Sequence, residues 1–156
     1  MTSTRKNLEV SRRILAKREE VFDAWTHPES MDWYCPETMR VVSASADVRI
    51  GGTYRVTMRA DDGQTHTCYG AYEAIVPDRR LVFSHQWEDR EPVQTHVTVQ
   101  LEDDDSGTEV TVTQEGFLDA DEAKSHEIGW TSMLAHLEKQ LAEPAPVRQR
   151  AQQAAR

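Results

Sequence analysis

Histidine and glutamate side chains are the residues of this sequence whose types could support acid–base chemistry. His85 and Trp87 fall at alternate positions of a predicted strand and so share its inward face, whereas His126 and Trp130 lie one helical turn apart on a predicted helix. If these two faces meet, His85 and His126 could act as general acid and base on an enolisable ketone, because an unperturbed imidazole has a pKa of about 6.5. The full set of candidates is His66, His85, His96, His126, Glu73 and Glu88.

No complete catalytic motif accompanies these residues. The sequence contains no Ser-His-Asp pattern, no HExxH, no P-loop and no glycine-rich dinucleotide fingerprint. Cys35 and Cys68 lack CxxC spacing and have no evident activating neighbour, so we expect reduced, half-buried thiols. We therefore predict no metal and no cofactor, keep His85 and His126 only as candidate catalytic residues, and favour a protein that is not an enzyme.

Composition and charge indicate how many domains the chain has and which partners they disfavour. The chain has 156 residues, which fits one domain, with 38% hydrophobic and 29% charged residues. Its formal net charge of −9 argues against binding to nucleic acid or to an anionic membrane surface. Because residues 1–7 are polar and no run of 18 apolar residues occurs, we expect a soluble, cytoplasmic protein, with a homodimer as a possibility.

Hydrophobic periodicity predicts a strand, two short helices, six further strands and a long helix, in that order. The first short helix begins near Arg18, and the second carries Met31 and Trp33 and ends before Pro36. Successive hairpins imply a curved antiparallel sheet of about seven strands, and one long helix on one face of it gives the α+β class. The expected strands cover residues 8–16, 39–50, 54–59, 66–76, 81–88, 93–101 and 108–114.

Capping and turn residues mark several boundaries. Thr26 is expected to cap the second short helix, and Asp119, with Glu122 three residues later, resembles a capping box for the last helix. Gly51 and Gly52 predict a tight turn that needs positive φ.

The last helix is predicted to have a wide apolar face and to end at a pair of prolines, Pro144 and Pro146. The domain is therefore expected to cover residues 8–143, and the polar tail 144–156 is expected to be disordered. The apolar face is formed by Ile128, Trp130, Met133, Leu134, Leu137 and Leu141.

A series of short segments, in order along the chain, resembles one known family. The segments are residues 21–29, Trp33, 47–55, 70–75, 80–83, 87–88, 107–110 and 126–130. Together they look like the bacterial single-domain form of the family named for the activator of the heat-shock-protein-ninety ATPase, within the START-like (SRPBCC) superfamily. The resemblance spans about residues 8–141 and implies the helix-grip fold with an internal cavity. The eukaryotic activators carry an additional N-terminal domain that we do not find in this sequence, so chaperone activation is not implied.

The resemblance also implies which residues border the cavity. Aromatic side chains on these elements, with methionines as adaptable apolar wall, suit a flat or apolar ligand. We assign Trp25 to packing of the first short helix instead. Three hypotheses follow: a binding protein for an apolar or aromatic small molecule, a polyketide cyclase or dehydratase, and a module that interacts with a chaperone or regulator. The expected ligand-binding residues are Met31, Trp33, Tyr54, Met58, Tyr72, His85, Trp87, His126, Trp130 and Met133.

Overall fold

The structure, a computed structural model, describes residues 6–90 and 93–142, so the prediction for the tail 144–156 lies outside the described residues. Strand β1 is followed by helix α1 and the 3-10 helix η1, then by six strands and the long helix α2. This order is the predicted one. The elements are β1 (Lys6–Ile14), α1 (Arg18–Thr26), η1 (Pro28–Trp33), β2 (Met39–Ala46), β3 (Thr53–Ala60), β4 (Thr65–Val76), β5 (Arg80–Trp87), β6 (Thr95–Asp104), β7 (Gly107–Phe117) and α2 (Ala120–Leu141).

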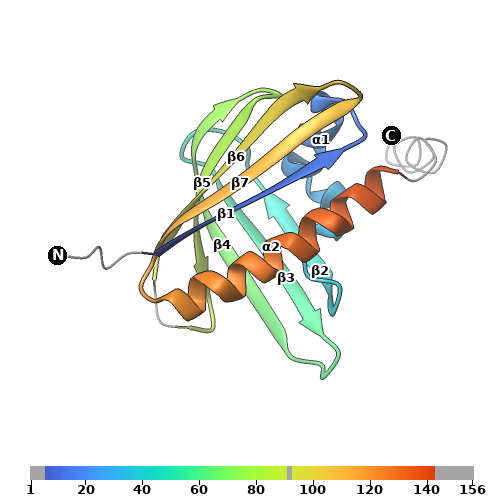
Figure 1. Ribbon diagram of the computed structural model, residues 1–156. Helices are drawn as coiled ribbons and strands as arrows, with labels where there is room; N and C mark the ends of the chain where they lie inside the picture. The colour runs from blue at the N-terminus through green and yellow to red at the C-terminus, as the bar shows by residue number, and fades with distance from the viewer. Residues whose placement is uncertain (1–5, 91–92, 143–156) are drawn as a thin grey trace.

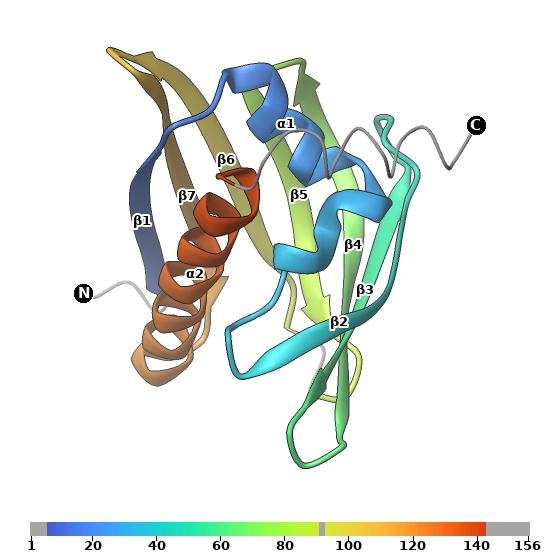
Figure 2. The same cartoon turned by 90° about the vertical axis from the view of Figure 1, so that its right-hand side faces the viewer.

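The seven strands form a single antiparallel sheet with the order β1-β7-β6-β5-β4-β3-β2. Strands β2 to β7 follow one another as hairpins, and β1 adds to β7 at the far edge. The sheet curves strongly, and α1, η1 and α2 all lie on its concave side (Figures 1 and 2). The predicted α+β helix-grip architecture is therefore confirmed.

Side chains alternate along the central strands, as a sheet with one buried face requires. In β3 the buried positions include Tyr54, Val56 and Met58, and β5 buries Leu81, Phe83 and His85 on the same inward face. Helix α2 closes the concave side, with Trp130, Met133, Leu134 and Leu137 buried beneath it. This alternation is what brings a histidine of β5 under the long helix.

The predicted cap of the last helix agrees with the structure, whereas the cap predicted at Thr26 does not. The Asp119 carboxylate accepts a hydrogen bond from the backbone N–H of Glu122 at 2.8 Å, which confirms the predicted cap of α2. Thr26, by contrast, is the last residue of α1, and His27 precedes η1. The prediction of a Thr26 cap was wrong because its hydroxyl instead donates to the Phe22 carbonyl one turn back.

Two further expectations need correction. Ile128 does not belong to the apolar face of α2, because 63% of it is exposed. Strand β2 ends at Ala46, and the following residues form the turn that leads to Gly51 and Gly52. Only Gly51 has positive φ, +83°, whereas Gly52 is required for space: a Cβ there would lie 2.0 Å from the Asp47 carbonyl oxygen. Over the ranges 6–90 and 93–142, the structure contains no helix with the length and apolar character needed to span a membrane.

Candidate ligand pocket

A pocket of about 160 Å³ lies between α2, the inward faces of β3, β4 and β5, and the segment that follows η1. Its walls are mostly apolar and aromatic, with histidine side chains interspersed. Six of the expected ligand-binding residues line it, namely Met58, His85, Trp87, His126, Trp130 and Met133. The other lining residues are Tyr34, Pro36, Met39, His66, Cys68, Arg90, Ser125 and Gly129.

Four expected ligand-binding residues do not line this pocket. Met31, Tyr54 and Tyr72 surround an inner cavity of only about 10 Å³, roughly the space of one water molecule. Trp33 is fully buried in the core, where its indole N–H donates to the Ala24 carbonyl at 2.9 Å. The sequence could not separate these residues from the pocket lining, because both groups lie between the sheet and the helices and differ only in how tightly their neighbours pack.

Aromatic packing fills the space between η1 and α2. Trp25 packs edge-on against Trp33, with ring centroids 4.7 Å apart, and stacks on Trp130 at 5.7 Å. Tyr34 contacts Trp130 edge-on at 5.8 Å. Trp25 thus links α1 to the underside of α2, in keeping with its assignment to packing. Its ring also lines the inner cavity.

His126 uses both of its ring nitrogens within the protein. Its Nδ1 lies 2.9 Å from the Glu122 carbonyl oxygen, which can only accept, so Nδ1 carries the proton. Its Nε2 accepts a hydrogen bond from the Trp87 indole N–H at 2.9 Å. Burial lowers the pKa of His126 from its ordinary value, and only the neutral ring satisfies both contacts. The lone pair that a general base would need is therefore already engaged.

His85 faces His126 across the pocket, with ring centroids 6.0 Å apart, but its nitrogens are free. Among the described residues, neither ring nitrogen has a hydrogen-bond partner. Only 5% of the residue is exposed. Burial, followed by the proximity of His126 and Arg90, lowers the pKa of His85 to about 3. His85 is thus a neutral imidazole at neutral pH, with one donor and one acceptor unused.

A second pocket, of about 320 Å³, adjoins the first at the N-terminal end of α2. His85, Trp87, Arg90 and His126 line both spaces, so the Trp87–His126 hydrogen bond lies in their common wall. Arg90 stacks on Trp87, 4.9 Å from the ring centroid, and lies 3.7 Å from a Glu122 carboxylate oxygen. Opening of the Trp87–His126 contact would join the two pockets.

Two buried polar atoms have no hydrogen-bond partner in the part of the chain that the structure describes: the Tyr34 hydroxyl and the Trp25 indole nitrogen. Burial, followed by Cys68 and Tyr72, raises the pKa of Tyr34 well above its ordinary value, so the phenol stays protonated. Tyr34 lines both the pocket and the inner cavity. An unpaired buried hydroxyl costs stability. The wall between the pocket and the inner cavity therefore carries a hydrogen-bonding group without a partner.

The remaining histidine and glutamate candidates contact polar side chains of other segments. His66 lies 2.8 Å from the Asp89 carboxylate and His96 lies 3.0 Å from Glu73. Glu88 pairs with Arg55. Of these residues, only His66 lines the pocket.

The two thiols are chemically quiet. Burial raises the pKa of Cys68 to about 12 and that of Cys35 to about 11, so neither forms a thiolate near neutral pH. The Cys35 thiol also contacts the Met39 carbonyl oxygen at 3.3 Å. Cys68 therefore contributes a small apolar surface to the pocket wall.

Several pocket residues were missed from the sequence because they lie outside regular elements or at element ends. Tyr34 and Pro36 come from the segment between η1 and β2, whose path periodicity does not predict, and Met39 is the first residue of β2. Arg90 follows β5. The aromatic pair Trp33-Tyr34 just before Pro36 was the one sequence feature that could have indicated a pocket wall in this segment.

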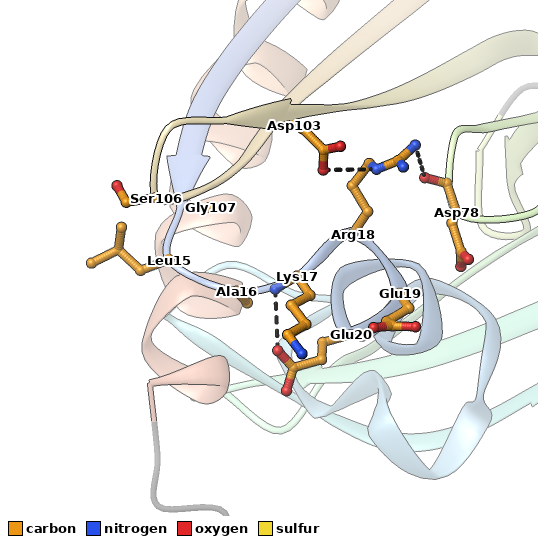
Figure 3. Close-up of a pocket in the computed structure, with 10 residues that line it drawn as sticks. All are labelled: Leu15, Ala16, Lys17, Arg18, Glu19, Glu20, Asp78, Asp103, Ser106 and Gly107. Atoms are coloured by element: carbon orange, nitrogen blue, oxygen red, sulfur yellow. Dashed lines mark hydrogen bonds and ion pairs between the residues drawn. The ribbon is translucent and has the colours of Figure 1, made fainter.

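A larger hollow lies elsewhere, at the start of α1, and has a volume of about 540 Å³ (Figure 3). Its polar groups bind one another: the Arg18 guanidinium reaches Asp103 at 2.9 Å and the Asp78 carbonyl at 3.5 Å, and Glu20 accepts from the Lys17 backbone N–H (Figure 3). It is a shallow polar depression outside the grip between sheet and α2, so we do not regard it as the ligand site.

Comparison with known proteins assigns the family. A model of the family described as "Activator of Hsp90 ATPase homolog 1-like protein" matches residues 15–142. Among solved structures, protein CV1439 from Chromobacterium violaceum is 28% identical with a TM-score of 0.78, over 88% of this chain and 97% of that one. The AHSA1 (SPO3351) protein from Silicibacter pomeroyi is 24% identical with a TM-score of 0.77, over 88% and 98%. A search of curated proteins found no significant match. Since the family match spans well over half of its length, the chain belongs to the Activator of Hsp90 ATPase homolog 1-like family.

Proposed function

We propose that the protein binds a small apolar or aromatic molecule in the pocket between the sheet and α2. The fold of its family is consistent with a ligand-binding domain. The observation that carries the proposal is His85, a neutral buried imidazole that lines a mostly apolar space and whose two ring nitrogens have no partner among the described residues. Apolar pockets with a few convergent polar groups are typical small-molecule sites.

The volume of the pocket sets the size of a suitable ligand. An apolar cavity of about 150 Å³ in a protein interior can hold benzene. The pocket of about 160 Å³ therefore suits a one- or two-ring molecule, and a larger one would extend into the adjoining pocket past Trp87 and His126.

The same geometry disfavours the enzymatic alternative. A cyclase or dehydratase needs a base that works near neutral pH. The pKa of His85 is about 3, and the Nε2 lone pair of His126 already accepts a hydrogen bond from Trp87. The structure gives no comparable support for a chaperone-interaction module. Its exposed large hydrophobic residues include Leu15, Val42 and Ile128, which lie in separate parts of the chain.

The test is calorimetric titration of the protein with 2-naphthol, followed by mass spectrometry of the mixture. We expect saturable 1:1 binding and recovery of unchanged 2-naphthol. Gly129 lines the pocket and a Cβ at this position meets no atom within 4 Å, so Gly129→Leu should fold normally while filling the pocket. Binding should be lost in this variant and retained in Ile128→Leu, the exposed neighbouring position.

A product that appears with wild-type protein and is lost in His85→Phe or His126→Phe would contradict a purely binding role. Equal binding to Gly129→Leu and wild type would place the ligand outside the pocket.

A further inference from the structure

The unused hydrogen-bonding capacity of His85 bears on the chemistry of the ligand. The ring is buried, and within residues 6–90 and 93–142 no group pairs with either nitrogen. The His85 nitrogens are not among the solvent-inaccessible atoms without a partner, so they remain accessible from the pocket. Because His85 lines both pockets, a molecule in either of them would meet this ring.

The remaining polar groups around His85 are already committed. Trp87 donates to His126, His126 donates to the Glu122 carbonyl, and the Thr95 hydroxyl donates to the His85 backbone carbonyl at 3.2 Å. A ligand atom that approaches this part of the wall therefore finds the His85 imidazole available, and another unpaired polar group of the pocket lining is the Tyr34 hydroxyl.

Charge on the pocket walls restricts the ligand further. Burial keeps His85 neutral, so it offers no positive charge to an anion. Arg90, the cation that lines both pockets, lies 3.7 Å from Glu122 and 4.0 Å from Asp89. The second pocket also includes Asp119. A carboxylate ligand would thus be desolvated without an unshared positive partner in the first pocket and would lie near Asp119 and Glu122 in the second.

From these observations we infer that His85 selects the functional group of the ligand: an uncharged apolar or aromatic compound with a hydroxyl or carbonyl oxygen that hydrogen-bonds to the His85 ring. This inference rests on the proposed binding function and adds the class of ligand to it. A hydroxyl can donate to one ring nitrogen or accept from the other, and a carbonyl can accept from the N–H.

Three probes of nearly equal shape test the inference: 2-naphthol, naphthalene and 2-naphthoate, each titrated calorimetrically at pH 7. In the wild-type protein we expect 2-naphthol to bind about tenfold more tightly than naphthalene, the usual effect of one neutral hydrogen bond. We expect 2-naphthoate to bind more weakly than either.

His85→Phe should abolish the preference for 2-naphthol while naphthalene still binds. His126→Phe is the matched control: the same substitution on the facing ring removes the contacts to Trp87 and Glu122 but leaves the free imidazole of His85. Its preference for 2-naphthol should persist. Urea unfolding of both variants reports whether they are folded.

The outcomes separate the two proposals. A preference for 2-naphthol that survives in His85→Phe, or tighter binding of 2-naphthoate than of naphthalene, would overturn the inference while the binding function stands. Failure of all three probes to bind the wild-type protein would overturn the proposed pocket function and this inference with it.

Discussion

Tyr54 and Tyr34 are both 4% exposed and both line the inner cavity, but only Tyr34 also reaches the pocket, and their hydroxyls differ in hydrogen bonding. The Tyr54 hydroxyl donates to the Ser84 carbonyl at 2.8 Å, in a region where the cavity that remains measures only about 10 Å³. The Tyr34 hydroxyl has no partner among the described residues. Burial alone therefore does not distinguish a satisfied polar group from an unsatisfied one, whereas its hydrogen-bond partners do.

The same contrast recurs around Trp130 and His85. Trp130 donates to the fully buried Gln114 at 2.7 Å, and Gln114 in turn donates to Thr95 at 2.8 Å, so this chain of polar groups is complete. His85 follows directly in space, since Thr95 donates to its backbone carbonyl, but its ring ends the chain without a partner. We interpret the incomplete groups as the side of the interior that is adapted to a ligand rather than to stability.

The largest expected effect comes from acidification, because it protonates His85, whose ring nitrogens have no partner in the described part of the chain. The pKa of His85 is about 3 in the folded protein and about 6.5 in the unfolded chain, so the unfolded state takes up the proton first as the pH falls. Stability should be complete above pH 6.5 and decrease between pH 6.5 and about 3. Between pH 7 and pH 5 we expect a loss of roughly 2 kcal/mol from His85, measured by urea unfolding at the two pH values.

His85→Phe provides the control for this prediction, because it removes the titrating group from a site where no hydrogen bond is lost. Its unfolding free energy should fall by roughly 2 kcal/mol less over the same pH range. The lowered pKa of His126 acts in the same direction and persists in the variant. An identical pH dependence in variant and wild type would show that His85 is not buried as a neutral ring.

Replacement of either tyrosine by phenylalanine should have a smaller effect on stability, and the two effects should differ in sign. Tyr54→Phe removes a made hydrogen bond and leaves the Ser84 carbonyl with one acceptor contact fewer, so it should cost about 1 kcal/mol. Tyr34→Phe removes an unpaired buried hydroxyl and should leave stability unchanged or raise it by up to about 1 kcal/mol. Urea unfolding at pH 7 compares them directly. Destabilisation by Tyr34→Phe equal to that by Tyr54→Phe would mean that its hydroxyl has a partner.

The contrast between the two regions also marks how far the sequence can be interpreted. Period-two alternation predicted that Tyr54, Met58 and His85 face inward, and the Asp119 cap placed the start of α2, because both signals are local. Whether an inward residue meets a void or a neighbour depends on contacts distant in sequence. Met58 lines the pocket, whereas Tyr54 on the same strand lines the nearly filled inner cavity, and no local pattern separates them.

Short-range competition and irregular segments account for the other differences. Thr26 has the composition of a cap, but its hydroxyl is used within α1. Tyr34 and Arg90 lie outside helices and strands, where hydrophobic periodicity carries no information about direction. The pairing of His126 with Trp87 was also beyond the sequence, although both residues were assigned to the site, because tautomer and partner follow from three-dimensional geometry.

The smallest expected effect concerns Gly129, on the α2 side of the pocket. An added Cβ meets no atom within 4 Å, so alanine fits without displacing a neighbour. In the interior of a helix, Gly is about 0.8–1.0 kcal/mol less favourable than Ala. Gly129→Ala should therefore raise the unfolding free energy by up to about 1 kcal/mol, measured in urea at pH 7. The gain comes from the helix propensity of alanine and requires only that the added methyl group displace no neighbour.

Gly51→Ala is the matched control, since a Cβ at Gly51 also meets nothing within 4 Å but the backbone there has φ of +83°. Alanine resists this left-handed conformation, so the variant should lose roughly 1 kcal/mol. The two substitutions thus add the same atom to open space and differ in backbone conformation. A loss of stability in both would show that Gly129 faces a neighbour across the pocket, and the incomplete side of the interior would then be packed as tightly as the region around Tyr54.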